Sequence, residues 1–265
     1  MNKKILIPSI VGLLVLVIVG IVVFTRLGKS DQTVETAPTK KMAPEQVNTI
    51  PVAERPFIQI HPETDGRNLT LTVVSLKKTA SETEYELEYQ AGSLLQGAFG
   101  KLSLASLPSS VKILLGSCSA GGACTYHTDI QGGTLLTRYA DDTKYALKSE
   151  WRYFDNTTKS PEVASKDAKF QLTSPELAKQ RYSIVFNTPG YPDGLEGTVA
   201  SEIFSLETSS AVKGNGDLTL RANQEGATHI AVWDGAEWSY VVATADGKTL
   251  TAEVPLASAY LAVTK

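Results

Sequence analysis

Side chains that bind metals are scarce in this chain of 265 residues, which has two cysteines and three histidines. Cys118, Cys124 and His127 form one close group, but they offer only three ligands, at a spacing that is not standard for zinc. The sequence has no Asp-x-Asp-x-Asp-Gly loop, so Asp141 and Asp142 are interpreted as solvated loop acids rather than as a calcium site. We therefore expect no metal and no cofactor.

The chain also lacks a block of lysine and arginine of the kind that neutralises the phosphates of nucleic acids. All of its acidic residues follow position 30, and four cations, at positions 3, 4, 26 and 29, flank the first apolar segment. The formal net charge of −3 becomes −7 when those four cations are set aside. The rest of the chain is mildly acidic, and we expect no nucleic-acid partner.

The first apolar segment, from Ile5 to Phe24, has 20 residues and no charge. A helix of this length spans about 30 Å, the thickness of the hydrocarbon core of a bilayer. A cleaved signal peptide is the alternative, but its apolar region is usually shorter, and Thr25–Lys29 contains no small-x-small cleavage site. The sequence predicts a short cytoplasmic tail (residues 1–4) and a transmembrane helix that contacts the lipid bilayer through residues 5–25.

The positive charges on the two sides of this helix do not favour a cytoplasmic N-terminus. A tail of four residues is nevertheless typical of signal anchors, and β-rich domains with paired cysteines are typical of exported proteins. We therefore predict a single-pass protein of a bacterial cell membrane with its ectodomain outside. Residues 26–56 contain four prolines and no apolar periodicity, so they predict a disordered tether.

Alternation of apolar and polar residues predicts β-strands along most of the remaining chain. Tyr85, Leu87 and Tyr89, for example, alternate with glutamates, which is typical of a strand with one buried and one solvated face. Strands are expected near residues 69–73, 85–89, 111–115, 133–139, 145–153, 182–186, 203–206, 218–220, 229–233, 240–243 and 250–254. The helix signal at Ser174-Pro175 predicts only a turn or two.

Short strands at this spacing predict an all-β fold. We expect an Ig-like β-sandwich over residues 57–208, followed by a small β-module over residues 209–265. The boundary is placed near Thr208 because the next residues are rich in serine, glycine and asparagine, and two Asp-Gly hairpin signals follow closely.

The expected C-terminal module contains Trp233-Asp234-Gly235, with Trp238 three residues further on. These residues resemble the W-D-G-x-x-W hairpin of small β-modules in bacterial surface and secreted proteins. The resemblance covers about 35 residues and extends to the strand pair at 249–254 and 260–263. It implies a structural or accessory part without catalytic residues. Asp234 and Gly235 are expected to form the turn, and the two indoles to pair across the hairpin.

The two cysteines, Cys118 and Cys124, are separated by five small residues. In an exported domain we expect such a pair to form a disulfide, with Gly121 and Gly122 allowing the chain to reverse. The closed loop is short, so the expected stabilisation lies toward the low end of the usual range of about 2–4 kcal/mol.

A different interpretation makes Cys118 a nucleophile. The order His61, Cys118, Arg138, behind a membrane anchor, resembles the general plan of sortases, the cysteine transpeptidases of bacterial surfaces. The residues before Cys118 match the T-L-x-T-C motif of that family poorly, and a second cysteine would oxidise the nucleophile. We therefore assign no catalytic residue.

By subtraction, the sequence favours a non-enzymatic, membrane-tethered module for surface display, adhesion or ligand binding. Its expected partner is an extracellular protein or a glycan. A thiol-dependent envelope enzyme and a subunit of an envelope complex, joined through open sheet edges, are the alternatives. The aromatic residues Trp151, Tyr153 and Phe154 are candidates for a sugar-stacking platform, although their alternation with charged residues favours a core face.

Overall fold

Strands make up the regular structure of residues 45–140 and 144–265, which the computed structural model describes. The only helical turns in these ranges are the 3-10 turns η1 (Val52–Glu54) and η2 (Leu177–Lys179), and the second lies at the predicted helix signal. The prediction of an all-β fold is thereby confirmed. The expected anchor (residues 5–25) lies outside the described residues, and within them no helix is long and apolar enough to cross a membrane.

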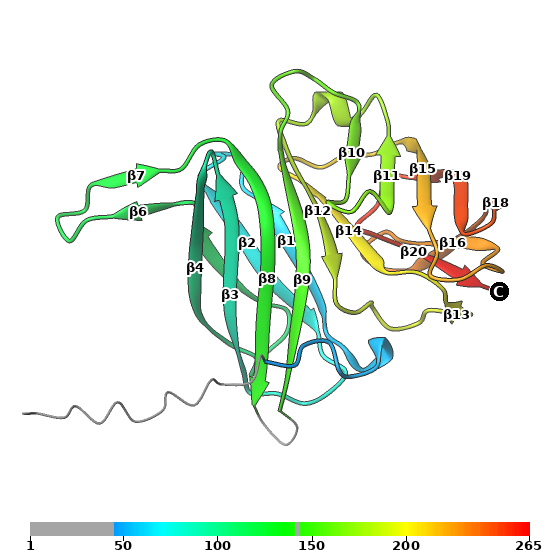
Figure 1. The fold of residues 1–265 in the computed structure, drawn as a ribbon, viewed down its shortest axis with the longest axis horizontal. Coiled ribbons are helices and arrows are strands. Elements are labelled where there is room, and N and C mark those ends of the chain that lie inside the picture. Colours follow the sequence, from blue (N-terminus) through cyan, green and yellow to red (C-terminus); the bar gives the residue numbers. More distant parts are fainter. Residues whose placement is uncertain (1–44, 141–143) are drawn as a thin grey trace, which may run out of the picture. The chain divides into compact units, whose positions relative to one another are not determined.

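The largest sheet has ten strands, all of them antiparallel to their neighbours (Figure 1). Nine follow one another in the order β17 (Trp238–Val242), β16 (His229–Trp233), β20 (Ala259–Thr264), β14 (Ile203–Thr208), β12 (Tyr182–Thr188), β9 (Lys144–Asp155), β8 (Ile130–Ala140), β3 (Glu82–Ala91) and β4 (Leu94–Ser103). The tenth, β13 (Thr198–Val199), pairs with β20.

Two smaller sheets pack on this large one. The first contains β1 (Phe57–Pro62), β2 (Asn68–Ser75) and β5 (Ser109–Leu114), and the second contains β10 (Glu162–Ala164), β11 (Phe170–Thr173), β15 (Asn215–Arg221), β19 (Thr249–Pro255) and β18 (Thr244–Asp246). Ile184 and Phe186 of β12 join the core beneath the first sheet, whereas Val185 joins the core beneath the second. Because neighbouring residues of a strand face opposite sides, the two smaller sheets cover opposite faces of the large sheet.

The part of the large sheet formed by β4, β3, β8 and β9 is covered on one face only. Tyr85, Leu87 and Tyr89 of β3 are buried toward the three-stranded sheet, as their alternation predicts. The glutamates between them point to the other side, which we call the outer face. Within the described residues neither smaller sheet covers this outer face, except at the end of β9, where Phe154 packs against the second core.

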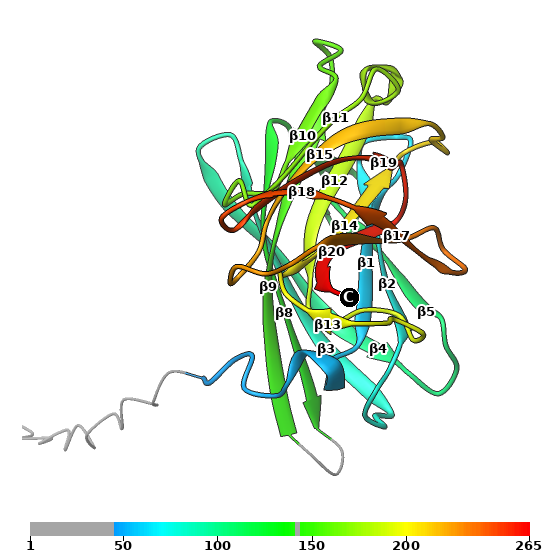
Figure 2. The same cartoon turned by 90° about the vertical axis from the view of Figure 1, so that its right-hand side faces the viewer.

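Strands that follow Thr208 return to sheets built by earlier parts of the chain. β15 pairs with β11, and β20 pairs with β14. Figure 2 shows this end of the molecule, with β20 among the other strands. Two sheets therefore contain strands from both sides of the domain boundary expected near Thr208. That this position separates two folding units stays a prediction.

Residues 45–56, which the sequence assigns to the tether, lie against the sheet. The side-chain amide of Asn48 donates a hydrogen bond to the carbonyl of Lys148 (2.8 Å) and accepts one from its N–H (3.0 Å). Arg55 donates from Nε to the carbonyl of Ile50 (2.9 Å). The structure differs from the expected disordered tether in these residues, because the side-chain amide of Asn48 forms hydrogen bonds with the backbone of β9. Apolar periodicity in the sequence does not reveal hydrogen bonds of this kind. Glu45 is the first residue of the unit that extends to Lys265.

Candidate ligand-binding face

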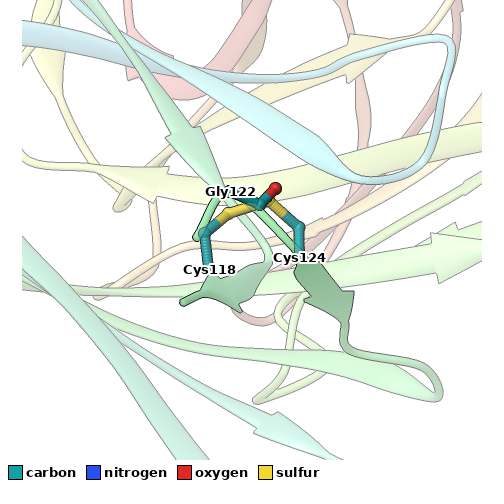
Figure 3. The surroundings of a disulfide bond; sticks show 3 residues. All are labelled: Cys118, Gly122 and Cys124. Atoms are coloured by element: carbon teal, nitrogen blue, oxygen red, sulfur yellow. A yellow bond between two sulfur atoms is a disulfide. The ribbon is translucent and has the colours of Figure 1, made fainter. Parts of the chain in front are cut away.

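The two cysteines lie in a hairpin formed by β6 (Gly116–Cys118) and β7 (Cys124–Tyr126), which projects from the molecule on the side of β4 (Figure 1). Their sulfur atoms are bonded at 2.06 Å (Figure 3). Gly122 adopts a φ of +83°, in the left-handed region that glycine favours, and so allows the chain to reverse as expected. Cys118 therefore carries no free thiol in this structure.

The residues of the sortase-like order have separate partners. His61 of β1 contacts Glu207 of β14 (Nδ1 to Oε2, 3.4 Å), and Arg138 of β8 contacts Glu45 and Glu86. No hydrogen bond or ion pair links His61, Arg138 and Cys118 in the described part of the chain.

The position of His127 gives no support to the alternative in which it binds zinc with the two cysteines. Its Nδ1 lies 2.9 Å from the hydroxyl of Tyr89, and the two rings are tilted against each other. Residues 45–140 and 144–265 contain no group of three or more His, Cys, Asp or Glu side chains arranged to hold a metal ion.

The W-D-G-x-x-W segment forms a hairpin between β16 and β17. Trp233 and Trp238 are directly opposed, with ring centroids 5.3 Å apart. The carboxylate of Asp234 accepts hydrogen bonds from the N–H groups of Ala236 (2.8 Å) and Glu237 (2.9 Å), and these bonds, the one from Glu237 first, lower the pKa of Asp234. These residues stabilise a turn, and none of them lines the groove described below.

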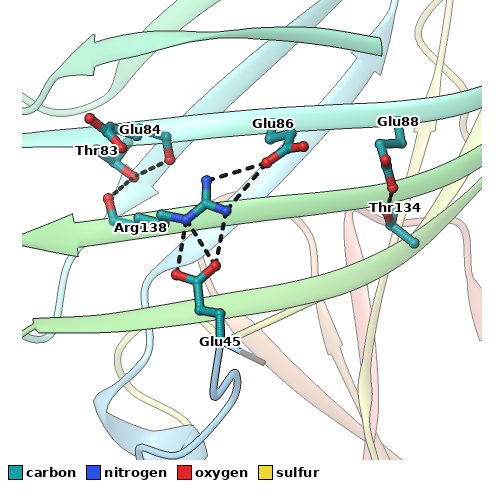
Figure 4. Close-up of polar contacts among 7 residues, drawn as sticks. All are labelled: Glu45, Thr83, Glu84, Glu86, Glu88, Thr134 and Arg138. Atoms are coloured by element: carbon teal, nitrogen blue, oxygen red, sulfur yellow. Dashed lines mark hydrogen bonds and ion pairs between the residues drawn. The ribbon is translucent and has the colours of Figure 1, made fainter. Parts of the chain in front are cut away.

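The outer face carries a row of carboxylates from β3 (Figure 4). Arg138 lies between Glu45 (Nε to Oε1, 2.9 Å) and Glu86 (Nη2 to Oε2, 3.3 Å), and the hydrogen bond to Glu45 is the main reason why the pKa of Arg138 is raised. Further along the row, Glu88 accepts a hydrogen bond from Thr134 (3.2 Å). Several polar groups of this face are thus paired with one another.

Next to this row lies a groove of about 760 Å³ whose floor is Gly132 and Gly133 of β8. A Cβ atom on Gly133 would lie 2.1 Å from the carbonyl oxygen of Glu88, and one on Gly132 would lie 2.3 Å from that of Trp151. Only glycine fits at these positions, because the neighbouring strands approach the backbone so closely. The register of β3 and β8 shifts beside these glycines, between Gln90 and Ala91.

The walls of the groove combine polar and apolar side chains. Arg152 lies over the ring of Phe154, 4.9 Å from its centroid, and Lys166 pairs with Glu150 (3.2 Å). The residues that line the groove also include Glu88, Gln90, Thr134 and Leu95. Its volume lies within the range typical of ligand sites, about 300–1,000 Å³.

Of the three candidate platform aromatics, Tyr153 and Phe154 belong to residues that line the groove, and only Phe154 lies outside the core beneath the three-stranded sheet. Trp151 and Tyr153 are buried in the core beneath the three-stranded sheet, as their alternation with charged residues favours. Sequence reasoning missed Gln90, Arg152 and Lys166 as groove residues. The signal that points to them is the Gly-Gly pair inside a strand pattern, which is typical of a bulge or a close backbone approach.

The chain matches no family model, no curated protein and no solved structure.

Proposed function

We propose that this protein is a non-enzymatic binding module of a bacterial cell envelope, held at the membrane by residues 5–25 with its β-sandwich part outside. Its ligand site is the groove over Gly132 and Gly133. The single observation that carries this proposal is the groove itself, which opens on the outer face of β3, β8 and β9.

The chemistry of the groove favours a glycan. A sugar ring has hydroxyl groups that both donate and accept hydrogen bonds around its rim, and C–H groups on its faces. Gln90 and Thr134 can do both, Arg152 donates and Glu88 accepts, while Phe154 and Leu95 offer apolar contact. All six of these residues lie on the strands β3, β4, β8 and β9. Sites built on strands are held more precisely than sites on loops.

The test is a calorimetric titration of the full chain in detergent with short N-acetylglucosamine oligomers, whose amides and hydroxyls match these side chains. We expect saturable binding. Gln90→Ala and Arg152→Ala should each weaken it about tenfold, the effect of losing roughly 1.4 kcal/mol of contact free energy.

Lys148→Ala is the matched control, because Lys148 lies on the same strand as Arg152 and on the same face but outside the groove. It should bind like the wild type. Failure of the wild type to bind any member of a wider panel of envelope oligosaccharides would refute the glycan assignment. Equal affinities of the Gln90, Arg152 and Lys148 variants would show that the ligand lies elsewhere.

A further inference from the structure

Strand β4 forms an open edge of the ten-stranded sheet, because it pairs with β3 and with no other strand of the described chain. It has ten residues, contains no proline, and pairs with β3 without a bulge. Lys101 is its only charged residue. Sheet edges are usually protected by charges, proline, bulges or short length, so this edge has almost none of the usual features that prevent pairing with another strand.

Two large apolar side chains of β4 are exposed to solvent. Phe99 is 87% exposed and Leu95 is 67% exposed. Both lie on the outer face, since they oppose Glu86 and Gln90 of β3. At the opposite end of the sheet the edge strand β17 has only five residues. The features that favour strand addition are therefore concentrated at β4.

The sequence of β4 is complementary to itself. In an antiparallel pair that continues the sheet, opposed side chains share a face, so odd-numbered residues oppose odd-numbered residues. With Gly97 on the two-fold axis, Leu95 of each copy opposes Phe99 of the other, which gives two apolar cross-strand pairs. Moving the axis to residue 98 or 99 places Lys101 opposite Leu95 or Gly97. Moving it to residue 96 or 95 places Phe99 beyond the partner's strand, so each of these registers gives fewer such pairs.

We propose that two copies of this chain associate through their β4 strands, antiparallel, with Leu95 of one copy opposite Phe99 of the other. The contact is isologous, as a two-fold dimer requires. In this register Lys101 lies beyond the partner's strand and keeps its ion pairs with Glu82 (2.9 Å) and Glu84 (3.1 Å). The two outer faces then form one continuous surface, on which the grooves of both copies open to the same side.

Cysteine cross-linking of the full chain tests the register. The chain has only the two cysteines that form the disulfide, so a new cysteine is the only free thiol. Gly97→Cys is tolerated, because a Cβ there meets only the carbonyl oxygen of Leu87, at an ordinary distance of 3.5 Å. Ser103→Cys is the matched control on the same strand and the same face. Under mild oxidation we expect Gly97→Cys to form a covalent dimer and Ser103→Cys to form at least tenfold less.

Sedimentation of the full chain in detergent tests the surface independently. Phe99→Lys should abolish the concentration-dependent dimer of the wild type, whereas Val242→Lys should leave it unchanged. Val242 is the control because it is 75% exposed on the opposite edge strand, and both variants place a lysine at a site that has room for one.

The proposal is overturned if the wild type sediments as a monomer at every concentration, which would leave β4 open to a strand of another protein. It is equally overturned if a dimer persists in Phe99→Lys, since the contact would then lie elsewhere, for example in the expected membrane helix. Cross-linking of Ser103→Cys as efficient as that of Gly97→Cys would exclude the proposed register. Loss of glycan binding alone would not affect any of these readouts, because they measure association directly.

Discussion

At the scale of single residues, the buried tyrosines Tyr153 and Tyr260 differ in whether their hydroxyl groups form hydrogen bonds. The hydroxyl of Tyr153 is buried and has no hydrogen-bond partner among the described residues, and burial raises its pKa. The hydroxyl of Tyr260 is also buried, but it accepts a hydrogen bond from the N–H of Ala257 (2.6 Å) and donates one to the carbonyl of Pro255 (3.1 Å). The same substitution should therefore have opposite effects at the two positions.

We predict that Tyr153→Phe raises the free energy of unfolding by about 1 kcal/mol, because it removes a desolvated hydroxyl that gains nothing in return. Tyr260→Phe should lower it by about 1–2 kcal/mol, because the N–H of Ala257 then loses its partner. Urea denaturation of both variants measures the difference. A loss of stability in Tyr153→Phe would mean that an ordered water satisfies its hydroxyl.

His61 makes stability depend on pH. Its hydrogen bond to Glu207 raises the pKa of the imidazole, against the opposing effect of burial. A raised pKa in the folded state means that the folded protein holds the proton more tightly than the unfolded chain. The resulting stabilisation is fully present below the unfolded pKa of about 6.5 and is lost as the pH rises through the folded pKa.

We predict that the free energy of unfolding falls by about 0.5 kcal/mol as the pH rises through this window, a small value because the pair is partly exposed and screened by solvent. His61→Gln should remove that decrease. His229→Gln is the control, since the ring of His229 bonds the hydroxyl of Thr228 rather than a carboxylate. Urea denaturation at several pH values checks this, and an unchanged pH slope in His61→Gln would contradict it.

At the scale of elements, the disulfide belongs to a projecting hairpin and not to a core. Both cysteines and the residues between them are exposed, and the hairpin closes on itself through the N–H of Ser119 and the carbonyl of Ala123 (2.8 Å). A cross-link stabilises by restricting the unfolded chain. If the hairpin opens locally when the disulfide is absent, the conformational entropy of the hairpin rises in the folded state as well as in the unfolded state. The global free energy of unfolding then changes little.

We therefore predict that replacing Cys118 and Cys124 together by serine lowers global stability by less than about 1 kcal/mol, below the range usual for disulfides. Hydrogen exchange of the Ser119 amide should become much faster at the same time. A global loss of about 2 kcal/mol or more in urea denaturation would instead show that the hairpin is coupled to the sandwich.

Strands with clean alternation were predictable from the sequence, and others were not. The strands β3 and β9 were predicted correctly because the large apolar residues that alternate along them, such as Leu87 in β3 and Leu147 and Trp151 in β9, face one core. β4 was missed because its alternation is weak. Leu95 and Phe99 point outward, whereas Leu102 is the only large side chain of the strand that is buried in the core. Gly100 also faces the core, where a Cβ would lie 2.6 Å from the hydroxyl of Tyr85. β1 was missed because it follows Pro56 directly at the end of the expected tether.

The candidate site was less predictable than the strands. The glutamates of β3 were expected on a solvated face, and they lie there. The groove lies beside a register shift near Gly132 and Gly133 and combines residues of β3 with residues of the later strands β8 and β9. Lys166 reaches it from a loop that no local pattern connects to these strands. Such a site is set by tertiary register, which alternation alone does not encode.

At the scale of the whole folded unit, the ten-stranded sheet is the element that both cores share. β12 is buried on both faces, and the strands after Thr208 complete the second core. β20 lies between β16 and β14, and its residues Tyr260 and Leu261 are fully buried. Removing these strands would expose an edge of β14 and the apolar face of the large sheet.

We predict that a chain ending at Thr208 does not fold cooperatively, because Val185, Phe204 and Leu206 would lose the strands that cover them. A chain from Glu45 to Lys265 is the control and should fold, since it keeps the whole unit. Circular dichroism during urea denaturation distinguishes the two: the control should unfold in one sharp transition, and the truncated chain should aggregate or unfold without one. A sharp transition in the truncated chain would instead establish residues 57–208 as an independent domain, with the boundary where the sequence places it.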